Sequence, residues 1–327
     1  MTEEKSPRMG AMFGGNDIRG FLDLPQVESD QVADADIMVV GVPIATSYIS
    51  VGAYCESAPD AVRAAFGWPG VLDHHDFDLG GKIMADGVNA VDCGNLPCSA
   101  SDFEHNRKLI HTQVAKLLDQ GAVPLVMGGD DSTPIPVLQA FEVHGPITVV
   151  QFDAHIDWRD EVAGERMGLS SNMRRASEMS WVENIIQIGA RGQGSARPSD
   201  YEDALEWGVK FFPMKDVQTL QDETIVKAIP KGSRVFINLD IDAMDPAVVP
   251  SVIGPAPGGF SYWRMVNLIS GIAERATIAG FSLVELMPDN DVGGRGALVA
   301  ARILANVLGL TSRQVANKKI RASVLYQ

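Results

Sequence analysis

Residues 147–157 read ITVVQFDAHID, a mostly apolar run that ends in two aspartates and a histidine at alternate positions. The β-branched and aromatic side chains of residues 147–152 favour a strand. Because side chains two positions apart point to the same side at a strand end, Asp153, His155 and Asp157 can converge on one point. The stretch therefore predicts a strand that carries candidate metal ligands at its carboxyl end.

Two further stretches have the same form. Residues 123–132 read VPLVMGGDDS, and residues 234–246 read RVFINLDIDAMDP. The first ends near Asp131, and the second contains Asp240 and Asp242 directly after its apolar run. In a parallel sheet the carboxyl ends of the strands meet at one edge, where ligands bind. We therefore expect three strands to bring acidic residues together at one edge of a sheet.

Short apolar runs alternate with helical patterns along the rest of the chain. We expect strands over residues 37–42, 123–127, 147–152, 184–188, 209–212, 234–239 and 278–284. We expect helices over residues 59–66, 102–120, 133–141, 262–274 and 298–308. Buried strands separated by helices are typical of a parallel sheet covered on both faces. The predicted fold class is α/β, a single-domain three-layer α/β/α sandwich around a central, mainly parallel sheet.

The predicted domain covers residues 36–327, because no Pro/Gly/Ser-rich linker divides the chain. The polar residues 1–35 are interpreted as an N-terminal arm that reaches over a neighbour rather than as a core element. The apolar runs are far too short to cross a bilayer, and no secretory signal is evident.

Charge and cysteine content narrow the class of partner. A net charge of −15 argues against nucleic acid and against anionic membranes as partners, and it is compatible with a cationic small molecule. Three cysteines, Cys55, Cys93 and Cys98, cannot fully pair, so we interpret them as buried, reduced residues. We expect a cytoplasmic protein that binds neither nucleic acid nor membrane.

The concentration of carboxylates predicts bound cations. Like charges in a partly desolvated site repel one another, and divalent metal ions relieve that repulsion. Mixed carboxylate and imidazole donors suit Mn²⁺, with Ni²⁺, Fe²⁺ or Zn²⁺ as alternatives. Taken alone, the pair Asp240 and Asp242 has a structural interpretation as a turn or helix cap, and so has Gly-Gly-Asp over residues 128–130 as a helix start. Their occurrence at three strand ends favours a dinuclear metal site.

The same motifs resemble those of the ureohydrolase superfamily, which includes arginases, agmatinases and guanidinobutyrases. Family patterns are Gly-Gly-Asp-His-Ser, Asp-Ala-His-x-Asp, and Asp-x-Asp-x-x-Asp-Pro followed by Pro-Gly-Gly. Their counterparts here are residues 128–132, 153–157, 240–246 and 257–259, and residues 284–291 resemble a late Val-Glu-x-x-Pro-x-x-Asp stretch. The resemblance spans most of the chain in the family's order, and it implies the arginase-like fold.

The resemblance also implies which residues hold two divalent metal ions, Mn²⁺ or Ni²⁺. The implied ligands are Asp131, Asp153, His155, Asp157, Asp240 and Asp242. The first of these is a histidine in the family. Either Asp131 serves as a ligand and weakens the metal as a Lewis acid through its added negative charge, or the adjacent metal is lost.

The resemblance further implies the catalytic and substrate-binding groups. Asp157 is expected to orient the attacking water and to take part in proton transfer, and Glu285 to pair with a guanidinium through two hydrogen bonds. Residues 168–176 resemble an agmatinase-like loop in which Leu169 replaces the family's histidine, and Asn172 of this loop is expected to bind substrate. The implied activity is metal-dependent hydrolysis of linear C–N bonds in a guanidine, amidine or biguanide.

The departures at positions 131 and 169 support a second hypothesis. The chain would then be a degenerate, weakly or non-catalytic subunit that supports an active sister subunit. Such a chain would resemble one of the two ureohydrolase-like subunits of metformin hydrolases. Ureohydrolases form trimers or hexamers, so we expect a homo- or hetero-oligomer, with Phe13 and Phe21 of the arm available for contacts. A nucleotide-binding protein is disfavoured because the sequence contains neither GxGxxG nor GxxxxGK[ST].

Overall fold

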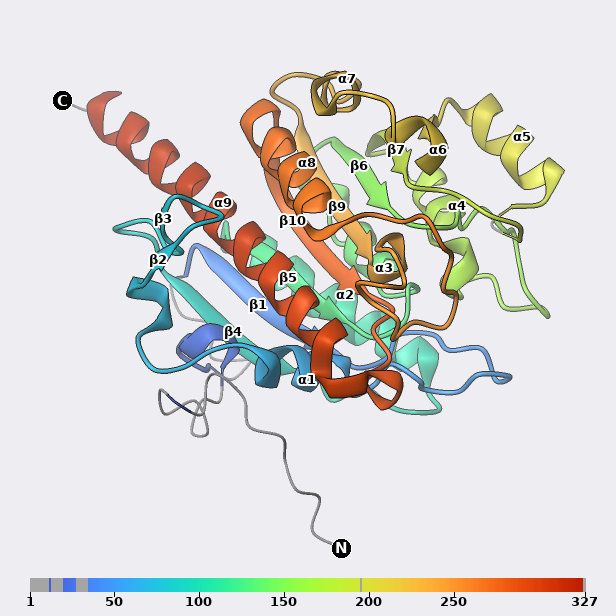
Figure 1. The fold of residues 1–327 in the computed structure, drawn as a ribbon, viewed down its shortest axis with the longest axis horizontal. Coiled ribbons are helices and arrows are strands. Elements are labelled where there is room, and N and C mark those ends of the chain that lie inside the picture. The colour runs from blue at the N-terminus through green and yellow to red at the C-terminus, as the bar shows by residue number, and fades with distance from the viewer. Residues whose placement is uncertain (1–11, 13–19, 28–34, 195, 326–327) are drawn as a thin grey trace, which may run out of the picture.

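A central parallel sheet organises the fold in the computed structural model, which describes residues 12, 20–27, 35–194 and 196–325 (Figure 1). The sheet has eight strands in the order β4-β1-β5-β10-β9-β6-β7-β8, and every neighbouring pair is parallel. Its strands are β1 (Ile37–Val42), β4 (Ala90–Asn95), β5 (Val123–Gly128), β6 (Ile147–Phe152), β7 (Val182–Ile188), β8 (Lys210–Phe212), β9 (Arg234–Asp240) and β10 (Thr277–Val284). A small antiparallel pair, β2 (His75–Asp76) and β3 (Gly81–Lys82), lies outside it.

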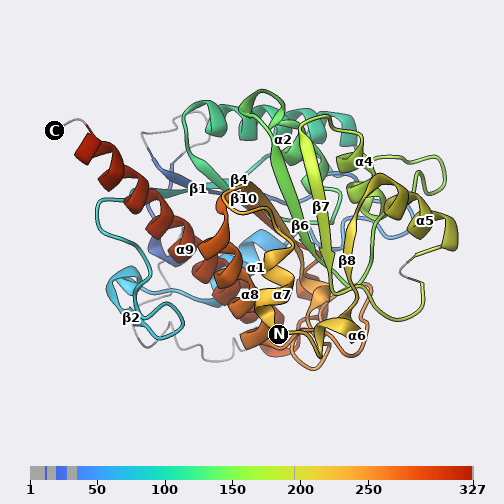
Figure 2. The same cartoon turned by 90° about the horizontal axis from the view of Figure 1, so that it is seen from above.

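Helices cover both faces of the sheet. They are α1 (Ala58–Ala65), α2 (Phe103–Asp119), α3 (Pro134–Gln139), α4 (Asn172–Ser177), α5 (Pro198–Trp207), α6 (Met214–Val217), α7 (Asp222–Lys227), α8 (Tyr262–Arg275) and α9 (Arg295–Leu325). One apolar core joins α1, α7, α8 and α9 to the sheet. A second core joins α2, α3, α4 and α5 to the sheet. Figure 2 shows α2 and α4 on one side of the sheet and α8 and α9 on the other. The predicted three-layer α/β/α architecture is therefore confirmed.

Most predicted elements are present with shifted ends, but several were missed. Strands β1 and β6 match their predicted ranges residue for residue. Strand β4 was not predicted because Asp92, Gly94 and Asn95 are residue types depleted from strands. The short helices α4, α5, α6 and α7 were also missed, as was the small hairpin; α4 lies largely within residues 168–176, which were interpreted as a loop.

Helix α9 is longer than the predicted range 298–308, which was ended before Gly309. This glycine does not stop the helix. A side chain there would place its Cβ 2.4 Å from Leu79 Cδ1, so the glycine permits close packing of α9 against the segment around the β2–β3 pair. By length and composition α9 could cross a membrane, but 61% of its apolar window is buried in the protein. It packs against α1, α8 and β10, as a core helix does.

Part of the predicted N-terminal arm belongs to the core. Phe21 and Leu22 are fully buried within the larger apolar core, and the backbone N–H of Phe21 donates to Asp92 Oδ2 at 2.7 Å. The interpretation of this part of residues 1–35 as an arm over a neighbour was wrong, because its apolar side chains pack against their own domain. Phe21 is therefore not available for subunit contacts, and Phe13 lies outside the described residues.

Candidate metal centre

The candidate site lies where four central strands end. Strands β5, β10, β9 and β6 are consecutive in the sheet, so the residues that follow them meet at one edge. Asp131 follows β5, Glu285 follows β10, Asp240 ends β9, and Asp153 follows β6. The backbone N–H of Glu285 donates to the carbonyl oxygen of Gly129 at 2.8 Å, which joins two of these strand ends directly.

Two glycines allow the chain after β5 to approach its neighbours. A Cβ on Gly128 would lie 2.6 Å from Val284 Cγ1, and one on Gly129 would lie 2.1 Å from the carbonyl oxygen of Pro43. Any larger residue at either position would push the Asp131 turn away from β10 and β1. The Gly-Gly pair therefore fixes where Asp131 stands.

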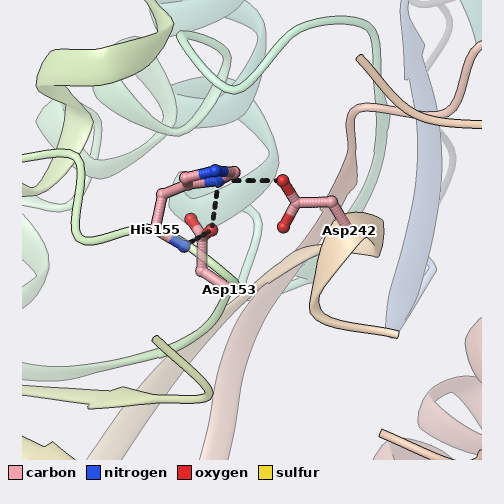
Figure 3. Close-up of side chains that lie close together, drawn as sticks. All are labelled: Asp153, His155 and Asp242. Carbon is pink, nitrogen blue, oxygen red and sulfur yellow. Dashed lines mark hydrogen bonds and ion pairs between the residues drawn. The ribbon is translucent and has the colours of Figure 1, made fainter. Parts of the chain in front are cut away.

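The acidic residues form two overlapping groups of metal-ligand type. Asp153, His155 and Asp242 make one group and Asp131, Asp153 and Asp240 the other, with donor atoms in each within 4.8 Å of one another. His155 Nδ1 lies 2.9 Å from Asp242 Oδ2 and 3.5 Å from Asp153 Oδ1, as Figure 3 shows. Because Asp153 belongs to both groups, its carboxylate is placed to be shared by two cations.

The predicted ligand Asp157 lies beside these groups rather than within them. Its carboxylate accepts hydrogen bonds from the side-chain amides of Gln151 at 3.2 Å and Asn172 at 3.3 Å, and its negative charge acts on Asp131 and Asp153. The structure therefore brings all six predicted ligands together.

The buried negative charges of the centre require compensating positive charge. Burial raises the pKa of the Asp131, Asp153 and Asp240 carboxyl groups well above the usual range, and the negative charges of neighbouring carboxylates raise it further. Burial alone would lower the pKa of His155, but its hydrogen bond to Asp242 and the surrounding carboxylates raise it to about 9. Divalent cations would stabilise the ionised carboxylates, so the donor set fits a metal centre.

Side-chain amides surround the Asp131 part of the centre. Asn238 Nδ2 donates to Asp131 Oδ1 at 2.9 Å, Asn172 Nδ2 donates to Asp131 Oδ2, and Gln151 Nε2 donates to Asp153 Oδ2 at 2.6 Å. Gln151 and Asn238 were missed in the sequence. Each lies two positions before a ligand on its strand, and this alternation, which places it on the ligand's side, was the available signal.

A cavity of about 230 Å³ opens over the centre. Its lining residues are Asp131, His155, Asp157, Trp158, Arg159, Leu169, Ser170, Gly194, Asp200, Asp240, Asp242, Ile253, Gly254 and Glu285. Asn172, the predicted substrate-binding residue, is fully buried and contacts Asp131 and Asp157 instead of lining this cavity. Tyr54 was not predicted, yet its hydroxyl donates to Glu285; the loop that carries it has no motif that would have identified it.

Both predicted catalytic residues have left-handed backbone conformations. Asp157 has a φ of 43° and Glu285 a φ of 70°. Such values are uncommon for residues other than glycine, and they cost free energy that the surrounding structure must offset. Backbone strain of this kind concentrates at functional sites.

Comparisons with known proteins agree with this architecture. A model described as "Arginase family" matches residues 35–309. The chain is 28% identical to a guanidinobutyrase of Pseudomonas aeruginosa, over 90% of this chain and 92% of that protein. It is 31% identical to a mitochondrial agmatinase of Gallus gallus, over 70% of this chain and 68% of that protein.

A solved structure has the same fold. Proclavaminate amidino hydrolase from Streptomyces clavuligerus superposes with a TM-score of 0.81 at 27% identity, covering 94% of this chain and 99% of that chain. The family model covers residues 35–309, and the superposition shows the same fold over most of the chain. The chain belongs to the arginase family.

Proposed function

We propose that the chain is a metal-dependent hydrolase that cleaves a linear C–N bond in a guanidine, amidine or biguanide compound. The observation that carries the proposal is that two metal-ligand groups, which have Asp153 in common, lie at one cavity. The buried carboxylate of Glu285 lines the same cavity. Guanidinobutyrase and agmatinase are the names of similar proteins, and both name guanidino substrates. Mn²⁺ and Ni²⁺ are the proposed cations.

Each cavity residue has a proposed chemical role. Bound divalent cations would supply Lewis acidity and an activated water. Asp157 lines the cavity beside the ligand groups, where its carboxylate can hold a water molecule and pass a proton to the leaving amine. Glu285 offers its carboxylate to the guanidinium. Leu169 also lines the cavity but has no proton to give, which leaves Asp157 as the proposed acid.

The cavity also suggests which end groups a substrate carries. Arg159 is the one lysine or arginine among the described lining residues, and no described residue forms a hydrogen bond or ion pair with its guanidinium, although its charge helps to lower the pKa of Asp200. The nearby Asp200 is already paired with Arg197 at 2.8 Å. A guanidino acid would place its cationic end near Glu285 and its carboxylate near Arg159. An amine at the far end, as in agmatine, would meet repulsion instead.

Substrate screening tests the proposal. The purified full chain, supplied with Mn²⁺ or with Ni²⁺, would be assayed with 4-guanidinobutyrate, agmatine and a dimethylbiguanide, and amine and urea release would be measured. Metal-dependent release from any of them is the expected result. The absence of turnover with every compound, in protein that binds metal, would contradict the proposal.

A second candidate function has its own support. Side-chain amides donate hydrogen bonds to the Asp131 carboxylate, and the Tyr54 hydroxyl donates to Glu285. Leu169 lacks a proton donor. Together these observations favour a weakly catalytic subunit that supports an active sister chain. We propose for either function a cytoplasmic homo- or hetero-oligomer, a trimer or hexamer. Light scattering of the chain alone, and of the chain co-expressed with another ureohydrolase-like chain, distinguishes a homo-oligomer from a hetero-oligomer. Full activity of the lone chain would exclude the supporting role.

A further inference from the structure

Arg191 follows the end of β7 and lies beside the turn after β6. Its backbone N–H donates to the carbonyl oxygen of Ala154 at 3.0 Å. The two segments approach closely at Gly189, which has a φ of 118°, because a Cβ there would lie 2.7 Å from the carbonyl oxygen of Asp153. A glycine at this position therefore allows the chain to bring Arg191 next to the ligand groups.

The guanidinium of Arg191 binds backbone oxygens of separate segments. Nη2 donates to the carbonyl oxygens of Asp242 at 2.8 Å and Met244 at 3.1 Å, which belong to the turn after β9. Nε and Nη2 both donate to the carbonyl oxygen of Ala256, at 3.0 and 2.7 Å. Nη1 donates to the carbonyl oxygen of Gly189 at 3.3 Å. The planar, forked guanidinium can hold these segments together, whereas the compact ammonium of a lysine cannot reach all of them.

One of these segments forms a wall of the cavity. Residues 252–257, here called the wall loop, include Ile253 and Gly254, which line the cavity. The loop lies against His155, because a Cβ on Gly254 would be 2.8 Å from His155 Cε1. Among the residues that the structure describes, the bonds from Arg191 to Ala256 are the only hydrogen bonds between the wall loop and the rest of the chain.

Arg191 also places a positive charge near the carboxylates of the site. Burial lowers the pKa of its guanidinium, and the negative charges of Asp242, Asp153, Asp245 and Asp240 oppose that shift. An arginine keeps its charge at neutral pH under such conditions. A lysine at the same position would keep the charge but lose the fork, so the two contributions of Arg191 can be separated by experiment.

We propose that Arg191 is a positioning residue: by joining the turn after β9 to the wall loop, it holds the loop against His155 and thereby sets the affinity for a guanidino substrate. Arg191 is not among the residues that line the cavity in the described part of the chain, so it acts through the loop rather than by contact with substrate. The effect on substrate rests on the proposed function. The hydrogen bonds to the loop do not, because they form in the chain alone.

Hydrogen exchange of the metal-free full chain tests whether Arg191 holds the loop. The backbone N–H of Phe260 donates to the carbonyl oxygen of Ala243, and that of Gly258 donates to Asp245 Oδ2. In Arg191→Lys we expect both amides to exchange at least about tenfold faster, because hydrogen bonds from a charged group to the adjoining segments are lost. Amides of β1 should exchange as in the parent chain. Unchanged exchange at both amides, or equal acceleration throughout the chain, would overturn the proposal.

Arg313→Lys is the matched control. The Arg313 guanidinium also donates to backbone oxygens of separate segments, those of Lys82, Ile83 and Gly309, none of which lines the cavity. This variant should leave exchange at Phe260 unchanged, and acceleration there equal to that in Arg191→Lys would overturn the proposal. Should Arg191→Lys not fold, side-chain NMR of the parent chain decides: slow exchange of the Arg191 Nε and Nη protons is expected, and free rotation of the guanidinium would overturn the proposal.

Substrate affinity separates positioning from a general contribution to stability. For 4-guanidinobutyrate, KM in Arg191→Lys should rise by about tenfold while kcat changes less, and KM for agmatine should rise equally. For a chain without turnover, the calorimetric dissociation constant replaces KM. Unchanged affinity despite faster exchange, or a loss confined to kcat, would overturn the proposal.

Failure of the hydrolase proposal gives a different result. Faster exchange and weaker binding without turnover of any guanidino compound would support the role of Arg191 and contradict the activity. Unchanged exchange and unchanged KM in an active chain would do the reverse. A chain that binds no guanidino compound at all would overturn the effect of Arg191 on substrate together with the proposed function.

Discussion

The hydroxyl of Tyr54 lies 2.7 Å from Glu285 Oε1 and 2.9 Å from Oε2, so it donates to both oxygens of the carboxylate expected to receive the substrate. A donor at nearly equal distances from both oxygens lies near the plane that bisects the carboxylate. A guanidinium that binds through two parallel hydrogen bonds is centred on the same plane and uses the same two oxygens. The backbone N–H of Asp131 also donates to Oε1, at 2.8 Å. A guanidinium must therefore displace the Tyr54 hydroxyl to bind Glu285 in this way.

Removing that hydroxyl should strengthen guanidinium binding. We expect Tyr54→Phe to lower the dissociation constant of 4-guanidinobutyrate by about tenfold, because no hydrogen bond to a charged group has to be broken. Burial raises the pKa of Glu285 to about 8, and the Tyr54 hydrogen bond opposes that rise. In this variant the Glu285 carboxyl should therefore keep its proton to a higher pH. Calorimetry is best done at about pH 9, where this carboxyl is more fully ionised.

Tyr48→Phe is the matched control for this prediction. Tyr48 belongs to the same loop, but its hydroxyl accepts from the backbone N–H of Ser170 at 3.3 Å rather than contacting Glu285. The control should bind like the parent chain. Weaker binding by Tyr54→Phe would contradict the prediction and would mean that Tyr54 holds Glu285 in its productive orientation.

Asp157→Asn should reduce kcat by more than about tenfold. Asparagine keeps the size of the side chain and tolerates the left-handed conformation that Asp157 adopts at a φ of 43°, so the backbone should be retained. It cannot accept a proton from the attacking water. Steady-state kinetics and thermal unfolding would be measured together, with Asp160→Asn, an exposed neighbour paired with Arg175, as the control. Near-parental turnover would exclude Asp157 as the proton-transfer group.

Arg159→Met should change substrate preference rather than catalysis in general. We expect KM for 4-guanidinobutyrate to rise by about tenfold, because a charged hydrogen bond to its carboxylate is lost, and KM for agmatine to stay level or fall. Arg166→Met removes an exposed arginine paired with Asp160 and serves as the control. An equal rise in KM for both substrates would show that Arg159 does not bind the far end of the substrate.

The sequence predicted the sheet and the clustering of the candidate ligands because both depend on local patterns. Asp153, His155 and Asp157 are spaced by the strand period, and β6 before them matches its predicted range. Tyr54 could not be found in the same way, because it lies 231 residues from Glu285 in the chain and the contact exists only after folding. The orientation of Asn238 depends likewise on Ser282 of a neighbouring strand.

The strand that was missed, β4, contains a buried carboxylate, Asp92, that accepts several hydrogen bonds. Arg63 Nε and Nη2 donate to the two oxygens of Asp92, each at 2.8 Å, and the backbone N–H groups of Phe21 and Gly94 donate to it at 2.7 and 2.9 Å. Asp92 is fully buried, and Arg63 nearly so. One aspartate therefore joins α1, β4 and the N-terminal segment, which explains why an unfavourable residue is placed in a strand.

Asp92→Ala should lower the free energy of unfolding by about 3–5 kcal/mol, because it removes the buried counter-charge of the Arg63 guanidinium and leaves it the exposed Asp60 carboxylate, 3.5 Å from Nη1. Urea unfolding would measure the loss, and hydrogen exchange at the Phe21 amide should quicken, because that N–H loses its acceptor. Asp73→Ala breaks an exposed pair with Lys82 and should change stability by less than about 1 kcal/mol. Equal effects of the two substitutions would mean that the Asp92 network contributes no more than a surface ion pair, and that burial of Phe21 and Leu22 alone holds the N-terminal segment to the domain.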